Sequence, residues 1–167
     1  MSMALRPRSV ALEIHQTRPF QSTGHETVVT LLRTAAVAER HLSAVIDAAE
    51  LTPAQYNVLR ILRGAGADGL PTLAIRDRLV DLSPGITRLI DRLEAADLVS
   101  RDRDADDRRQ VTCRITPAGL ALLKKLDAPV DAAERAVVTQ LSPAEQRTLV
   151  RLLDLVRSGL AVPASDL

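Results

Sequence analysis

The sequence contains very little cysteine. Cys113 is the only cysteine among 167 residues, which excludes an intrachain disulfide and any zinc site built from several cysteines. This composition fits a reducing compartment, and we expect a cytoplasmic protein. A redox-sensing role for Cys113 stays open, because such a thiol needs an accessible, electropositive setting that a sequence does not reveal. We prefer a structural role for it.

Aromatic residues and long apolar runs are also scarce. The chain has one tyrosine, one phenylalanine and no tryptophan, so its core must be built from Leu, Val, Ile and Ala, which favours helices. No apolar run approaches the roughly 20 residues that span a bilayer. Glu13 and His15 interrupt the one candidate signal-peptide core near the N-terminus. We therefore expect no membrane partner.

Basic and acidic residues are nearly equal in number. The 22 basic and 21 acidic residues leave a net charge of +1, so binding of nucleic acid through bulk charge is not indicated. Any function that depends on charge must depend on where the charges lie. The length suits a single domain of ordinary size or a small domain with helical extensions.

Helical patterns occupy both ends of the chain. Residues 1–24 form an arm with room for one short helix, and apolar residues at helical spacing predict an amphipathic helix over 25–50. Thr52 as N-cap, Pro53 in the first turn and Gln55 near the capping-box position predict the next helix. Two further helices are expected within 117–160, before a tail at 161–167. They contain Pro129 as an expected kink and Ser142 as a cap. The last one is expected to bury Leu149, Leu152, Leu153 and Val156.

Two short helices, PTLAIRDRLV and SPGITRLIDRLEAADLV, follow each other closely in the centre of the chain. In the second, Ser83 is the expected N-cap and Pro84 the first helical residue. Its apolar face consists of Leu82, Ile86, Leu89, Ile90 and Leu93, and its other face is polar. Two helices joined by a tight turn, the second with a polar outward face, indicate a helix-turn-helix.

The segments LVSRDR and RQVTCRIT alternate apolar and polar residues around DADD, which predicts a β-hairpin. Its tip is RDRDADDRRQ, residues 101–110, where four arginines balance four aspartates. We expect the aspartates to shape the turn, with Asp107 holding an arginine in position, and the arginines to face phosphate or the minor groove. The sequence thus predicts a winged helix-turn-helix over 51–116, with the long helices before and after it. The fold class is mainly α with a small β-hairpin wing.

Such a fold suits a DNA duplex. Small residues in the N-terminal half of the second short helix allow close approach to the major groove, where Arg88 can reach a phosphate or a guanine edge. The neighbouring hairpin suits the minor groove. These residues therefore indicate DNA binding through local placement of charge.

The stretches LTPAQYNVLRIL, SPGITRLIDRLEAADLVSR, DDRRQVTCRITPAGLALL and LSPAEQRTLVRLL resemble successive landmarks of the MarR family of bacterial transcriptional regulators. The resemblance covers about residues 25–160. It implies a homodimer in which the helices of 25–50 and 117–160 interleave, and in which each subunit presents one winged helix to a pseudo-palindromic operator. By this likeness Ser83, Gly85, Thr87 and Arg88 fall at major-groove positions, and Arg108 and Arg109 at the wing tip. Pro84 and Arg103 complete the candidate DNA-contacting residues.

The chain departs from the family pattern at Asp97, where glycine is usual. Aspartate tolerates the left-handed conformation better than most residues, so we expect the turn to survive. The arm is also longer than the family minimum. We expect a homodimeric regulator, a repressor released by a small-molecule effector whose identity the resemblance does not supply, and neither a cofactor nor a metal.

The residues leave other interpretations open. Residues 101–110 could form a charge-balanced solvated loop, and Arg88 could lie on an exposed face without a ligand. The winged helix could bind a protein instead of DNA. A small enzyme is disfavoured, because no nucleophile and base, metal cluster or phosphate-binding glycine loop is recognisable. The three histidines, His15, His25 and His41, are not spaced as a pair of metal ligands on one helix. Tyr56 could line a pocket or pack in the core.

Overall fold

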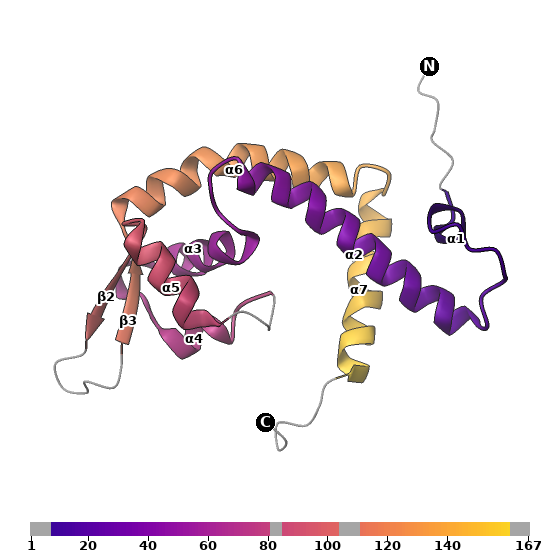
Figure 1. The fold of residues 1–167 in the computed structure, drawn as a ribbon, viewed down its shortest axis with the longest axis horizontal. Helices are drawn as coiled ribbons and strands as arrows, with labels where there is room; N and C mark the ends of the chain where they lie inside the picture. The colour runs from indigo at the N-terminus through magenta and orange to yellow at the C-terminus, as the bar shows by residue number, and fades with distance from the viewer. Residues whose placement is uncertain (1–7, 81–84, 104–110, 161–167) are drawn as a thin grey trace.

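The computed structural model describes residues 8–80, 85–103 and 111–160. Two long helices, α2 (Thr23–Asp47) and α6 (Pro117–Val137), pack side by side, and a compact group of short elements lies beneath one end of them (Figure 1). That group contains α3 (Pro53–Ala65), α4 (Thr72–Arg76), α5 (Ile86–Ala95) and a small sheet. The long helix α7 (Pro143–Leu160) follows α6, and the short α1 (Val10–Glu13) precedes α2. The predicted fold class, mainly helical with a small β wing, is confirmed.

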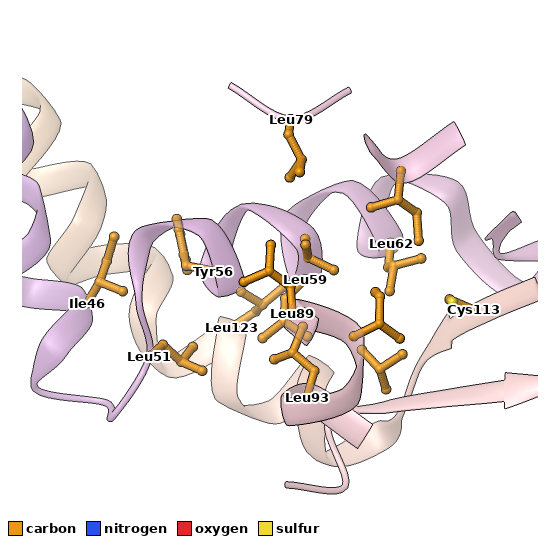
Figure 2. Packing of buried hydrophobic residues seen from close by; sticks show 14 of the residues in the cluster. Ile46, Leu51, Tyr56, Leu59, Leu62, Leu79, Leu89, Leu93, Cys113 and Leu123 are labelled. Carbon is orange, nitrogen blue, oxygen red and sulfur yellow. The ribbon is translucent and has the colours of Figure 1, made fainter. Parts of the chain in front are cut away.

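Helix α3 is the centre of the core. Its start is fixed by the predicted capping box, because Thr52 Oγ1 accepts a hydrogen bond from Gln55 N at 3.2 Å and Gln55 Oε1 accepts one from Thr52 N at 2.9 Å. Val58, Leu59 and Leu62 on this helix have no solvent exposure. Side chains from α2, α5 and α6 surround them (Figure 2). The core is aliphatic, as the composition predicts.

Helix α5 begins later than expected. Its first residue is Ile86 and its N-cap is Gly85, whose backbone is extended and makes no side-chain cap, so the helix does not start at Pro84. The expected cap Ser83 lies outside the described residues, as do Pro84 and Leu82. The predicted amphipathic pattern holds over the described part: its buried residues are Ile86, Leu89, Ile90 and Leu93.

The sheet has one strand more than the predicted hairpin. Strands β2 (Val99–Arg103) and β3 (Val111–Ile115) pair antiparallel, and we call this hairpin the wing. The two-residue strand β1 (Leu70–Pro71) pairs with the other edge of β3. Such a short strand has no alternating pattern that a sequence could show. The wing tip at 104–110, with Asp107, lies outside the described residues.

The two ends of the chain differ in how they pack. In the arm, α1 buries Val10, and Glu13 forms an ion pair with Arg33 of α2 at 3.3 Å. Helix α7 starts at the predicted Ser142 cap, whose hydroxyl and backbone N–H both donate to Glu145 Oε2. The expectation that this helix buries Leu149, Leu152, Leu153 and Val156 is wrong for the single chain, because α7 has no buried residue. Among the described residues, none buries the apolar face of α7.

Cys113 has a structural place. It lies on β3 with no solvent exposure, and its Sγ is 3.7 Å from Thr72 Oγ1 of α4. Burial raises the pKa of the Cys113 thiol, and the hydrogen bond to Thr72 only partly opposes this. A buried thiol with a raised pKa is a poor nucleophile, which agrees with the preferred structural role.

Gly119 allows α6 to approach the base of the wing. A Cβ at this position would lie 2.4 Å from the Leu98 carbonyl oxygen and 2.8 Å from Ile115 Cγ1. The same Leu98 oxygen accepts a hydrogen bond from Thr116 N at 3.1 Å, so the backbone at Leu98 cannot easily move away from α6. Any side chain here would push α6 away from the sheet.

We predict that Gly119→Ala lowers the free energy of unfolding by about 1 to 3 kcal/mol, because overpacking displaces backbone rather than a flexible side chain. Urea denaturation followed by circular dichroism measures the change. Gly64→Ala is the matched control, since a Cβ there meets nothing within 4 Å. Alanine in a helix should leave stability unchanged or raise it by up to about 1 kcal/mol. Equal stability of Gly119→Ala and the wild type would show that this close approach is not a constraint.

Candidate nucleic-acid interface

Helix α5 is held by one face and exposes the other. Its apolar residues pack into the core against α3 and α4. Gly85, Thr87 and Arg88 lie exposed at its N-terminal end, and Asp91 and Arg92 follow one turn later. None of the ion pairs among the described residues involves Arg88. A helix fixed in this way can enter a groove without rearranging.

The candidate residues of the wing are only partly described. Arg103 is the last residue of β2 and pairs in register with Val111 of β3. Asp107, Arg108 and Arg109 lie outside the described residues. The wing follows α5 directly through a short turn, whose hydrogen bonds connect the two elements.

That turn depends on Asp97. Its φ of 57° lies in the left-handed region, as expected for a residue standing where the family has glycine. Leu98 N donates to Leu93 O at 2.9 Å, and Thr116 Oγ1 donates to the Asp97 carbonyl oxygen at 2.7 Å. The turn is therefore fastened both to α5 and to the residue that caps α6.

Arg101 has a role that the sequence reasoning missed. It donates a hydrogen bond to Asp91 of α5, and its Nε lies 3.4 Å from Glu94 Oε2. The sequence predicts that the arginines of 101–110 face DNA, whereas the described structure engages the Arg101 side chain with two acids of α5. The signal was available: Arg101 stands two residues after the buried Val99, and alternate residues of a strand share a face.

Arg114 braces the other side of the wing. It forms an ion pair with Asp102 on the neighbouring strand, and its Nε donates to the Ala67 carbonyl oxygen at 2.9 Å. Gly69 lies so close to β3 that an added Cβ would be 2.4 Å from the Cys113 carbonyl oxygen. These contacts hold β3 in place from both sides.

A cavity of about 820 Å³ lies between the winged helix and the long helices α2 and α6. Its apolar wall includes Leu42, Ile46, Tyr56, Leu79 and Val130, and its polar groups include Glu39, Asn57, Arg60 and Glu134. Tyr56 is 7% exposed, so it packs in the core and also borders the cavity. Arg60 lies over its ring at 5.9 Å and pairs with Glu134 at 3.6 Å.

The described residues offer little else that could carry chemistry. Within them, no three His, Cys, Asp or Glu side chains are grouped so that they could hold a metal ion. No helix in this part of the chain combines the length and apolar character needed to cross a membrane. The exposed face of α5, the wing and the cavity are therefore the features that a function must explain.

Comparison with known proteins agrees with this geometry. The model of the MarR family matches residues 51–111. A transcriptional regulatory protein for the hcr operon of Thauera aromatica is 31% identical over 131 residues, 77% of either chain. The crystal structure of a MarR transcription factor from Planctomyces limnophilus is 39% identical with a TM-score of 0.65, over 82% of this chain and 99% of that one.

A third similar protein is BpsR of Bordetella bronchiseptica, whose structure describes regulation of its DNA binding by 6-hydroxynicotinic acid. It is 26% identical with a TM-score of 0.70, over 84% of this chain and 98% of that chain. These three matches cover 77 to 84% of this chain. The chain therefore belongs to the MarR family of transcriptional regulators, which is the family that its sequence predicts and is not a family of enzymes.

Proposed function

We propose that the chain is a homodimeric, sequence-specific DNA-binding repressor that a small-molecule ligand releases from a pseudo-palindromic operator. The observation that carries the proposal is the exposed end of α5, where Thr87 and Arg88 project from a helix whose other face is fixed in the core. A protein held on promoter DNA in this way blocks access to it. The partners are double-stranded DNA, a second copy of the chain and an effector.

The N-terminal end of α5 is the proposed reading element. Gly85 has open space around it, so DNA backbone can approach closely, and Thr87 and Arg88 lie on the exposed side within the first turn. Arginine forms its best specific contact with the O6 and N7 atoms of guanine. Ser83 and Pro84 precede this turn and are proposed to contact the same groove. The orientation of α5 supports a major-groove role.

The wing is the proposed second contact. Arg103, Arg108 and Arg109 are assigned to phosphates or the adjacent minor groove, and Asp107 to holding the tip in shape. The position of β2 and β3 supports this, because the described part of the hairpin follows α5 directly and lies beside it (Figure 1). Narrow minor grooves concentrate negative potential, which attracts arginine.

A second copy of the chain is the proposed cover for α7. This helix exposes a series of large apolar side chains, and α2 does the same on its N-terminal half. The exposed residues are Leu149, Val150, Leu152, Leu155, Val156 and Leu160 on α7, with Val28, Leu32 and Val37 on α2. A monomer rarely leaves such a surface open to water. Interleaving helices 25–50 and 117–160 of two chains would bury it and set two copies of α5 about 34 Å apart, one helical turn of DNA.

The cavity is the proposed effector site. It lies between the winged helix and the long helices, so a ligand there could change the spacing of the two α5 helices. Mostly apolar walls with a few polar groups are typical of small-molecule sites. BpsR, whose DNA binding is regulated by 6-hydroxynicotinic acid, supports a small-molecule effector for this chain. The ligand can act only through unequal affinity for the DNA-binding and released arrangements. Repeating the DNA titration with compounds that raise the melting temperature identifies such a ligand.

The first test is DNA binding by the full chain. Fluorescence anisotropy with a duplex from upstream of its own coding sequence should give a Kd in roughly the nanomolar to micromolar range, weaker at high salt. A random duplex of equal length should bind more weakly. Equal affinity for both duplexes, or no binding, would contradict the repressor and leave a protein-binding winged helix as the alternative.

Arg88→Ala should weaken binding to the upstream duplex by about 1 to 3 kcal/mol, because one bidentate base contact is lost. Binding to the random duplex should change little. Arg135→Ala is the matched control, since Arg135 lies on α6 and pairs only with Asp131 among the described residues. An equal loss on both duplexes, with a shallower salt dependence, would instead assign Arg88 to a phosphate.

Charge placed on α7 should separate the dimer. The double variant Leu152→Glu/Val156→Glu puts two carboxylates on the apolar face, and sedimentation equilibrium should then show a monomer where the wild type is a dimer. Leu73→Glu is the control, since Leu73 is an exposed apolar residue on α4, outside the proposed dimer helices. A wild-type monomer in solution would refute the interleaved dimer directly.

A further inference from the structure

The exposed side of α5 carries acidic side chains on the surface that would face DNA. Asp91 is four residues after Thr87 and three after Arg88, so it occupies the same strip of the helix one turn later. Glu94 follows in the last turn. Their side chains are 53% and 45% exposed. Two carboxylates on a surface that meets phosphates would oppose binding.

Arg101 contacts both of these carboxylates from the neighbouring strand. It donates to Asp91 Oδ1, and its Nε stands 3.4 Å from Glu94 Oε2 at an angle that makes no hydrogen bond. Its side chain is 25% exposed, whereas the arginines of the other ion pairs in the described residues are 35 to 71% exposed. In the described part of the chain, no other arginine is as enclosed or contacts two acids.

The charge balance of α5 makes this contact consequential. On the exposed side of the helix, Arg88 and Arg92 are balanced by Asp91 and Glu94, so the helix alone offers DNA no net positive charge. When the positive charge of Arg101 is added, the net charge of this surface becomes positive. Burial lowers the pKa of Arg101, but the hydrogen bond to Asp91 and the proximity of Glu94 outweigh it, so the pKa is raised and the charge persists.

We propose that Arg101 is a charge-compensating positioning residue, which neutralises Asp91 and Glu94 so that DNA phosphates can approach α5, and which does not itself contact DNA. The inference rests on the proposed function. It assigns to a residue of the wing an effect on DNA binding that acts entirely through α5. The arginines of the hairpin then divide into those that touch DNA and one that prepares the surface for it.

A double-mutant cycle tests the inference. The four proteins are the wild type, Arg101→Gln, Asp91→Asn/Glu94→Gln, and the variant that combines all three changes. Anisotropy titrations with the upstream duplex give four Kd values, and melting temperatures confirm that each protein is folded. Arg135→Gln is the control, because it breaks an exposed ion pair on α6.

Arg101→Gln should raise Kd about tenfold in the wild-type background, about 1.4 kcal/mol. It should raise Kd about twofold or less when Asp91 and Glu94 are already neutral, because nothing remains to compensate. Asp91→Asn/Glu94→Gln alone should bind at least as tightly as the wild type. Arg135→Gln should have no effect.

Three results would overturn the inference while leaving the proposed function intact. An unchanged Kd for Arg101→Gln would remove the effect itself. An equal loss in both backgrounds would mean that Arg101 contacts DNA directly. Weaker binding by Asp91→Asn/Glu94→Gln would mean that the contact is a mechanical tether for the wing. Absence of binding by the wild type would instead refute the proposed function, and the inference with it.

Discussion

The burial of α3 is the interaction on which the rest of the structure depends. Val58, Leu59 and Leu62 have no exposure, and α2, α5 and α6 all pack around them. Because the core has no tryptophan or phenylalanine to fill space, short aliphatic side chains must interdigitate closely. The orientation of α5, and with it the direction in which Thr87 and Arg88 project, follows from this packing. Capping at Thr52 begins the helix that makes it possible.

Local features that depend on only a few adjacent residues were predictable from the sequence. The Thr52 capping box, the apolar stripe of α5 and the left-handed Asp97 each depend on a few adjacent residues, and each appears as expected. The start of α5 was wrong by two residues, because Ser and Pro signal a helix start more strongly than the Gly85 that provides it. The strand β1 was missed, since two residues carry no periodicity. Ser83, Pro84, Asp107, Arg108 and Arg109 lie outside the described residues, so their roles stay predictions.

Contacts between distant elements were harder to foresee. An apolar stripe on a helix predicts that the stripe is covered, but not by which chain. The spacing of Leu149, Leu152 and Val156 was correctly identified as apolar, yet within one chain these side chains are 40 to 47% exposed. The same residues would be core positions in a dimer of the proposed kind. The sequence pattern therefore predicts that these side chains are buried, but it does not predict which surface buries them.

The charged residues also show that composition does not reveal where side chains lie in the fold. Residues 101–110 contain equal numbers of arginines and aspartates, and the whole chain has a net charge of +1, so neither total indicates a DNA-binding surface. The geometry divides these charges. Arg101 turns inward to two acids on α5, Arg114 pairs with Asp102 across the wing, and Arg88 is left without a partner in the described residues. In a nearly neutral protein, a surface for phosphates is made by neutralising acids at that surface and leaving selected arginines free, because screening in salt makes charges more than about 8 to 10 Å away count for little.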